Sequence, residues 1–159
     1  ILYTPAEIKT LTPLRNEVEK RATADLKDIF LCHAWEDRKT TAKNLTDLLV
    51  ENGTSVWFSE NEVLLGTNLL REIDKGLAAS RVGIVLVTKS FLKRIQGNGI
   101  ADKELSALLS RDQLIPVLDG VTFEELFDVS PLLASRSGLN TSEETMEDIA
   151  NKLSEVVSV

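Results

Sequence analysis

The sequence has very few of the residues that cross-link a small protein or bind a metal. Its 159 residues include one cysteine and one histidine. A single cysteine excludes an internal disulfide, and because Cys32 lies inside an apolar run, we expect a small buried residue in a reducing compartment. No cysteines and histidines stand at metal-ligand spacing, so we expect neither a metal site nor a bound cofactor.

Long apolar runs are missing as well. The longest, residues 82–87, is far shorter than the roughly 20 residues of a membrane-spanning helix. The chain starts at Ile1 and shows no basic segment followed by an apolar one, so a secretory signal is not visible. We therefore expect a cytoplasmic protein without membrane contact, and a segment of a longer chain that carries further domains.

Clusters of basic residues are a third absence. The formal net charge is −7, and the lysines and arginines are scattered instead of grouped with aromatic residues. A surface that binds the phosphate backbone needs such grouping, so nucleic acid is not an expected partner. The composition, 43% hydrophobic and 27% charged, is that of an ordinary globular protein, and the length fits one domain.

Four short apolar runs are rich in β-branched or aromatic residues, as strands covered on both faces should be. They are residues 29–32, 56–58, 82–87 and 114–118. Segments with helical spacing of apolar residues lie between them, at 42–49, 69–77 and 105–109. This alternation predicts an α/β fold, a flavodoxin-like five-stranded parallel sheet with helices on both faces.

The two ends of the chain are less regular. After a turn at residues 119–120, we expect a short helix at 123–127, a brief fifth strand at 137–140, and a last helix through Val157 that Thr141 or Ser142 caps. At the other end, Pro5 and Pro13 interrupt the pattern and residues 15–24 form a polar helical piece. We expect residues 1–26 to be a lead-in helix or linker.

The residues that follow each strand are the informative ones, because ligands of open parallel sheets bind at the carboxyl ends of the strands. No Gly-rich phosphate loop follows the first strand, and His33 has no cysteine or serine partner in a recognisable catalytic motif. A phosphate-accepting receiver domain would need an aspartate at the end of the third strand. That strand ends in Val87-Thr88, so this class is excluded.

Several motifs in a fixed order carry a family resemblance. They are Asp28-Ile29-Phe30-Leu31-Cys32-His33 with the loop Ala34-Trp35-Glu36-Asp37, then Gly53-x-x-Val56-Trp57-Phe58, Leu65-Gly66, Ile73-x-x-Gly76-Leu77-x-x-Ser80-Arg81 and Lys103-Glu104-Leu105. Together they resemble the Toll/interleukin-1 receptor homology (TIR) domains, the bacterial ones in particular, clearly over residues 27–120. The resemblance implies a TIR domain at 27–159 with its BB loop around residues 62–67.

Many bacterial TIR domains cleave NAD⁺, so the resemblance implies an NAD⁺ glycohydrolase whose catalytic carboxylate is Glu104. Cleavage of the nicotinamide–ribose bond releases a neutral leaving group from a cationic base, and a general acid is therefore unnecessary. A single carboxylate that stabilises the oxocarbenium-like transition state suffices. Without its motif, Glu104 would be one more glutamate on a helix surface.

The resemblance also implies residues that bind NAD⁺. They are Ala34 and Trp35 in the first loop, Glu60 and Asn61 after the second strand, and Gly66 in the BB loop. Some of these interpretations have a structural alternative: Trp35 can be a half-buried aromatic that covers the edge of the sheet, Glu60 a solvated loop carboxylate, and Gly66 the residue that lets the loop turn.

One position departs from the family pattern. TIR enzymes usually carry a tryptophan four residues before the catalytic glutamate, and here that position is Ile100. We expect the pocket to be completed by Trp35, by the polar segment 97–99, or by a neighbouring subunit. Structural roles are expected for His33 in its loop, Trp57 in the core and Arg81, which we expect to fix the loop before the third strand.

Two functions follow from the resemblance. The first is an NAD⁺ glycohydrolase that gives nicotinamide and ADP-ribose, or a cyclic variant, and acts in bacterial defence or virulence. The second is a non-catalytic module that signals through TIR–TIR contacts. Glu104 in its motif favours the first and Ile100 favours the second, and self-association through TIR–TIR contacts is expected in both cases.

Overall fold

The computed structural model describes residues 3–20, 26–58, 74–97, 114–129, 131–134 and 138–158. The strands are β1 (Lys27–Cys32), β2 (Val56–Phe58), β3 (Ser80–Val87), β4 (Leu114–Leu118) and β5 (Leu139–Asn140). The helices are α1 (Pro5–Lys20), the short 3-10 helix η1 (Trp35–Asp37), α2 (Thr41–Glu51), α4 (Lys89–Gly97), α6 (Phe123–Val129), α7 (Pro131–Ala134) and α8 (Met146–Val157). Residues 74–78 are also helical.

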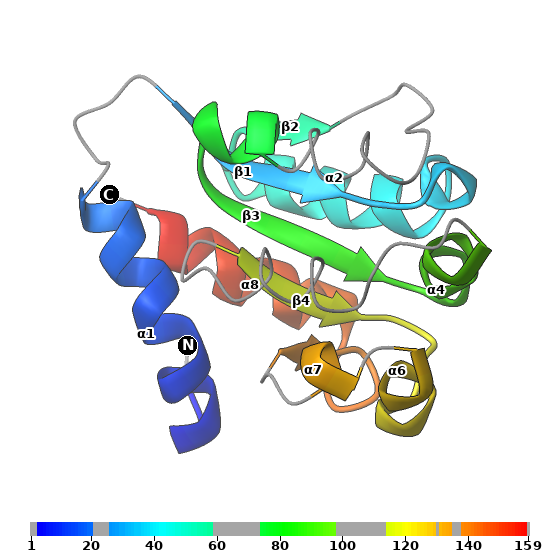
Figure 1. Cartoon of the computed structure of the whole chain (residues 1–159). Coiled ribbons are helices and arrows are strands. Elements are labelled where there is room, and N and C mark those ends of the chain that lie inside the picture. Colours follow the sequence, from blue (N-terminus) through cyan, green and yellow to red (C-terminus); the bar gives the residue numbers. More distant parts are fainter. Residues whose placement is uncertain are drawn as a thin grey trace.

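The five strands form one sheet in the order β2-β1-β3-β4-β5, and every neighbouring pair is parallel (Figure 1). This is the flavodoxin-like order that the alternation of strands and helices predicts. β3 is the central strand and β1 lies beside it, so the loops that follow these two strands start from neighbouring positions. That adjacency sets which loop residues meet.

Alternate residues of the strands enter two separate apolar clusters, one on each face of the sheet. Ile29 and Leu31 of β1 face the cluster covered by α1, α2 and α8, whereas Phe30 and Cys32 face the cluster that includes residues of α4 and α6. Helices therefore cover both faces, as predicted. Cys32 is buried, also as predicted.

The glycine of the Gly76-Leu77 motif is required by packing. A Cβ built on Gly76 would lie 2.4 Å from ring atoms of Phe30, so no larger residue fits against this strand without movement. Phe30 also packs on Trp57, with ring centroids 5.6 Å apart. Trp57 is only half-buried because β2 is the edge strand, so its prediction as a core residue is correct in part.

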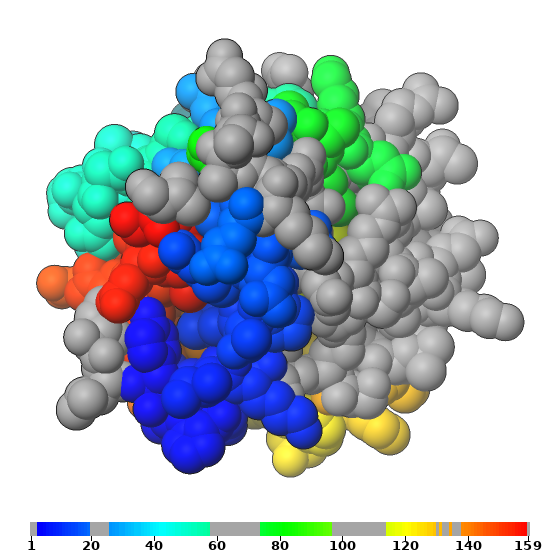
Figure 2. Space-filling view, turned by 90° about the vertical axis from the view of Figure 1, so that its left-hand side faces the viewer, coloured from blue at the N-terminus to red at the C-terminus, as the bar shows by residue number. Residues whose placement is uncertain are grey.

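The N-terminal segment is a helix, one of the two alternatives expected for it, but without the expected interruption by proline. It runs from Pro5 to Lys20 with Pro13 inside it, so this proline does not interrupt the helix. The buried residues Leu11, Leu14 and Val18 form a stripe that packs in the same apolar cluster as α8, and Figure 2 shows α1 (blue) lying beside α8 (red). Burial of this stripe offsets the roughly 3 kcal/mol that an internal proline costs a helix.

The cap of the last helix was also predicted wrongly. Thr145, not Thr141 or Ser142, is the N-cap of α8, and its hydroxyl accepts a hydrogen bond from the amide of Asp148. Thr141 instead donates its hydroxyl to the Asp119 carboxylate at 2.8 Å, which ties the end of β5 to the end of β4. The prediction chose the first candidate caps after the strand, whereas the strand's own connections occupy them.

Arg81 has a structural role at the other end of the sheet. Its guanidinium donates to the carbonyl of Leu26 and to the carboxylate of Asp28, the latter at 2.6 Å. Asp28 in turn accepts from the amide of Ser55. Arg81 therefore fixes the start of β1 against β2 and β3, which is the kind of structural role that was expected for it.

Candidate functional site

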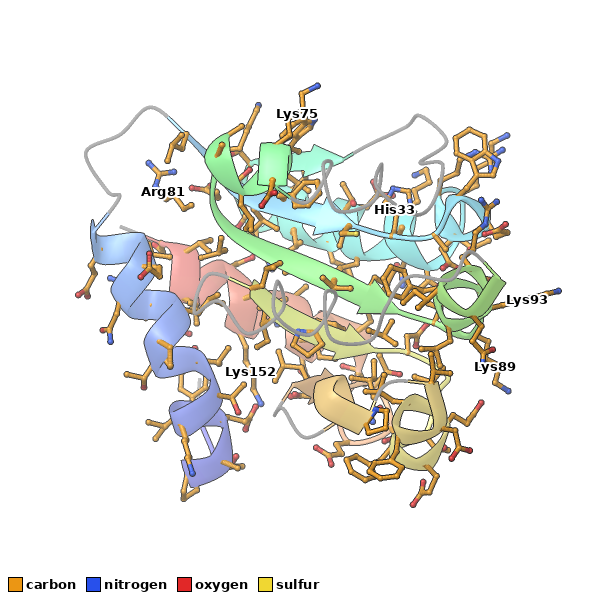
Figure 3. The ribbon with its side chains drawn as sticks, in the orientation of Figure 1. His33, Lys75, Arg81, Lys89, Lys93 and Lys152 are labelled. Carbon is orange, nitrogen blue, oxygen red and sulfur yellow. The ribbon has the colours of Figure 1, made fainter. Side chains whose placement is uncertain are left out.

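The carboxyl ends of β1, β3 and β4 lie at one edge of the sheet, which we call the carboxyl edge. Figure 3 shows His33 at the same end of the molecule as Lys89 and Lys93 of α4. A hollow of about 360 Å³ opens at this edge, and its described lining is Glu36, Ser90, Lys93 and Arg94. Ligands of open parallel sheets bind at this edge.

Two larger hollows lie elsewhere, beside α1. One of about 440 Å³ is lined by residues of α1 and α8, and one of about 420 Å³ surrounds Lys152. The polar groups in both already anchor α1: Arg15 donates to the carbonyl of Val156, and Lys152 pairs with Glu7 and Glu144. Topology, and not size, therefore makes the carboxyl edge the candidate ligand site.

A buried hydrogen bond joins the loops that follow β1 and β3. Thr88 Oγ1 donates to Asp37 Oδ2 at 2.5 Å. Thr88 Oγ1 also accepts from the amide of Phe91 at 3.1 Å, and this bond caps the first turn of α4. Asp37 is 8% exposed and Thr88 is 6% exposed. Since β1 and β3 are neighbours in the sheet, the end of one loop is fastened to the start of the other.

Burial raises the pKa of Asp37, because removal from water penalises the charged carboxylate. The hydrogen bond from Thr88 opposes this shift and lowers the pKa, as does the charge of His33. Glu36 and Asp119 add to the upward shift. A carboxyl group with a perturbed pKa at the ligand-binding edge is a feature of functional sites.

A second contact joins the same two segments at the surface. Arg94 of α4 binds Glu36 in a bidentate pair, with Nε 2.8 Å and Nη2 2.5 Å from Glu36 Oε1. Arg94 lowers the pKa of Glu36 through these bonds. The side chains are 24% and 44% exposed, so the pair is partly screened by water.

The first loop carries Trp35 directly before the two residues that make these contacts. The Arg38 guanidinium lies 3.5 Å from the centroid of the Trp35 ring, and it also donates to the Trp35 carbonyl at 2.9 Å. Ala34 is buried, and its carbonyl lies 2.8 Å from His33 Nδ1. His33 is itself 7% exposed, which agrees with the structural role expected for it.

Four of the predicted site residues, Glu60, Asn61, Gly66 and Glu104, lie outside the described residues. Their roles stay predictions, as do those of Ala34 and Trp35. Within the described part of the chain, the first loop is the predicted segment that the structure places at the carboxyl edge, against α4. Trp35 is half-buried there.

Sequence reasoning did not assign a role to Asp37, Thr88 or Arg94. Thr88 could have been found, because it directly follows the third strand, whereas Asp37 stands at the end of η1 and no local pattern places it beside Thr88. Arg94 could not, because its position depends on the direction in which α4 leaves the sheet.

Cations and an acid share the hollow at this edge, where Arg94 is paired with Glu36. Lys93 and Arg94 line the hollow, and Lys89 lies on the same helix (Figure 3). Lysine side chains at such a hollow favour an anionic ligand. Within the described ranges, no group of three or more potential metal-binding side chains is found.

A family model described as the TIR domain matches residues 29–155. This chain belongs to the TIR domain family. The matched span includes every strand of the TIR domain from the middle of β1 onward, together with η1 and most of α8.

Two relatives illustrate the similarity of this TIR domain to known proteins. The 2′ cyclic ADP-D-ribose synthase BtTIR of Bacteroides thetaiotaomicron is 34% identical over 79% of this chain and 44% of that relative. The NAD(+) hydrolase TcpA of Theionarchaea archaeon (strain DG-70-1) is 35% identical over 82% of this chain and 40% of that relative. The chain thus spans less than half the length of both.

Among solved structures, the TIR domains of the activated Roq1 resistosome bound to the effector XopQ resemble this one. The match covers 82% of this chain and 81% of the other, with a TM-score of 0.47 and 20% identity.

Considering only the residues that the structure describes, no helix has the length and apolar character needed to cross a membrane.

Proposed function

We propose that this TIR domain cleaves the nicotinamide–ribose bond of NAD⁺, giving nicotinamide and either ADP-ribose or a cyclic form of it. The observation that carries the proposal is the family match over residues 29–155, together with relatives that are named as an NAD(+) hydrolase and a 2′ cyclic ADP-D-ribose synthase. Lys93 at the hollow and Arg38 in the first loop are cations that suit the phosphates of such a dinucleotide.

Glu104 is the proposed catalytic carboxylate. Because nicotinamide leaves as a neutral molecule, the demand on the protein is to stabilise the positive charge that develops on the ribose. A carboxylate near the ribose hydroxyls does this without transferring a proton. Water then attacks to give ADP-ribose, or a group of the same molecule attacks to give a cyclic product. NAD⁺ is the substrate, and no other cofactor takes part.

The first loop and the segment after β2 are the proposed NAD⁺-binding segments, through Ala34 and Trp35 and through Glu60, Asn61 and Gly66. Support for the first loop is its place at the carboxyl edge and the stacking of Arg38 on Trp35. Since Ala34 is buried in an apolar cluster, we propose that its backbone and not its methyl group faces the substrate.

Self-association is the proposed condition for activity. The position that usually holds a pocket tryptophan is Ile100, so a neighbouring copy or the first loop has to supply the missing wall. The relatives are more than twice as long as the matched segment, and we propose that further domains of a longer cytoplasmic chain drive assembly, in defence or virulence. Nucleic acid and membranes are not part of this proposal.

The test is nicotinamide release from an assembled sample. The domain is fused to an oligomerising partner, incubated with NAD⁺, and compared with Glu104→Ala and with Glu124→Ala, a matched glutamate in the first turn of α6. We expect release by wild type and by the Glu124 variant, and a loss of at least about a hundredfold on substitution of Glu104. Equal release by all three forms would show that Glu104 is not the catalytic carboxylate.

A non-catalytic TIR–TIR module is the second candidate, and Ile100 is the residue that favours it. It predicts that the assembled domain binds its own kind but releases no nicotinamide at any NAD⁺ concentration. A sedimentation measurement on the same sample separates the two cases, because it shows whether assembly occurred. Assembly without release would select the second function.

A further inference from the structure

We propose that Asp37 is a positioning residue, which clamps the first loop against α4 through Thr88 and so holds Trp35 and Arg38 ready for an NAD⁺-type dinucleotide. The inference rests on the proposed function for its substrate. Its structural part, the clamp itself, rests on contacts within the described residues. We use "the clamp" for the Asp37–Thr88 hydrogen bond.

The clamp occupies the place where it has the most effect on the loop. Asp37 is the last residue of η1, whose first residue is Trp35, and the Asp37 amide donates to the Ala34 carbonyl at 3.0 Å. The Arg38 amide donates to the Trp35 carbonyl at 3.2 Å. One side-chain bond at Asp37 therefore restrains a complete turn of chain that contains the Trp35–Arg38 pair.

The other half of the clamp is equally well fixed. Thr88 directly follows β3, and its hydroxyl both donates to Asp37 and caps α4 through the Phe91 amide. Phe91 is in turn buried in the apolar cluster under the sheet. Thr88 cannot shift without loss of a helix cap, so the loop is fastened to a rigid point of the fold.

The clamp retains a charged group in a costly position, which argues for a role beyond stability. Burial of the Asp37 carboxylate is unfavourable, and its hydrogen bond to a hydroxyl returns only part of the lost hydration. A neutral or apolar pair at 37 and 88 would pack with less penalty. Holding a binding loop in its bound shape is a benefit that offsets such a cost, because a preformed loop loses less entropy when ligand binds.

The carboxyl edge offers a matched control. Thr141 Oγ1 donates to Asp119 Oδ1 at 2.8 Å, which is also a threonine-to-aspartate bond at the end of two neighbouring strands. It joins β4 to β5 and does not involve the first loop. Thr88→Val and Thr141→Val therefore remove the same chemical group from the same edge, and only the first releases the loop. Thr88→Ser keeps the hydroxyl and is the conservative variant.

The first measurement is steady-state nicotinamide release by the assembled domain. We expect Thr88→Val to raise KM for NAD⁺ about tenfold and to leave kcat within about twofold, since binding and not chemistry is impaired. Thr141→Val should leave both constants unchanged, and Thr88→Ser should restore the wild-type KM. A fall in kcat with KM unchanged, or an equal effect of the two valine variants, would overturn the proposal.

The second measurement keeps the clamp testable if wild type releases no nicotinamide, a result that would reject the proposed function alone. Amide hydrogen exchange reports on the loop without a substrate. The amides of Asp37 and Arg38 should exchange about tenfold faster in Thr88→Val and at the wild-type rate in Thr141→Val. Unchanged exchange at both amides in Thr88→Val would show that the bond does not restrain the loop.

Discussion

Asp37 at the carboxyl edge and Glu7 at the start of α1 are acids that tie a peripheral segment to the body of the domain, and their environments are opposite. Asp37 is buried against a neutral hydroxyl, and its pKa is raised mainly by burial. Glu7 is paired with Lys152, and its pKa is lowered mainly by the hydrogen bond from that lysine. Lys152 extends from α8 beside α1 (Figure 3).

The junction of α1 and α8 is compensated in charge. Burial lowers the pKa of Lys152, and its hydrogen bonds to Glu144 and Glu7 outweigh that effect and raise it overall. Glu7 also forms a capping box with Thr4, because each residue's side chain accepts from the other's amide. Glu7 and Lys152 thus each have a partner that favours the ionised form, which is what a structural anchor requires.

Asp37 at the carboxyl edge is instead bonded to a neutral hydroxyl, and its burial opposes the charged form. An anchor is built so that its charges favour folding, whereas a residue that serves binding is retained although its charge opposes folding. We therefore expect substitutions at the junction of α1 and α8 to change mainly the stability, and substitutions at the clamp to change mainly NAD⁺ binding.

We expect the greatest loss of stability from a substitution that disrupts the junction of α1 and α8. Lys152→Met removes the cation that faces Glu7 and Glu144, whose side chains are only 14% and 16% exposed. We expect the free energy of unfolding to fall by roughly 2–3 kcal/mol, measured by urea denaturation. Nicotinamide release per folded molecule should not change. Lys152→Arg keeps the charge and should lose less than about 1 kcal/mol, so equal losses in both variants would contradict the ion-pair explanation.

Neutralising each acid in turn should change the free energy of unfolding in opposite directions. Asp37→Asn keeps an oxygen that accepts from Thr88 and removes the buried charge, so we expect the free energy of unfolding at neutral pH to stay constant or to rise by up to about 1 kcal/mol. Glu7→Gln should lower it by about 1–2 kcal/mol, because Lys152 loses one of its two carboxylates. Asp47→Asn, in an exposed pair with Lys43, is the control and should change it by less than about 0.5 kcal/mol. The comparison fails if both acids respond with the same sign.

The two acids should also affect the pH dependence of stability in opposite ways, because their pKa values shift in opposite directions. The lowered pKa of Glu7 means that its contribution is present above its ordinary value of 4.5 and is lost as the pH falls through the folded-state value. The raised pKa of Asp37 means that its contribution is fully present below its ordinary value of 3.8 and is lost as the pH rises through the folded-state value. Melting temperatures measured between about pH 3 and about pH 7 should show this. Wild type should melt at a higher temperature than Glu7→Gln at the high end of the range, and at a higher temperature than Asp37→Asn at the low end.

The smallest expected effect concerns the exposed pair beside the clamp. Arg94→Gln removes the bidentate contact to Glu36, which is 44% exposed, so we expect a loss of about 0.5–1 kcal/mol in the free energy of unfolding. This loss should shrink when salt is raised to about 1 M, since salt screens exposed charges. The effect of Thr88→Val should not depend on salt, because its donor is neutral. A salt-independent Arg94 effect would mean that packing and not charge holds this contact.

Local patterns predicted the elements well where one rule was sufficient. The apolar runs at 114–118 and 56–58 are strands with those bounds, and the leucine spacing in 42–49 lies within α2 (Thr41–Glu51). The short helix predicted at 123–127 is α6, and its capping box of Thr122 and Glu125 is readable in the sequence. Thr141 and Thr145 could not be distinguished as caps, because both are threonines before a helical pattern and only the sheet shows which one is already in use.

The sequence alone determined the class of the fold, the order of its strands and the family, because these depend on residue periodicity and on motifs that are contiguous in the chain. It also named the first loop as a candidate site. The contact of Asp37 with Thr88 and the packing of α1 beside α8 are visible only in the folded chain, since both join residues far apart in the sequence. Their energies come from burial and from geometry across neighbouring strands or helices, and neither quantity is written in a local pattern.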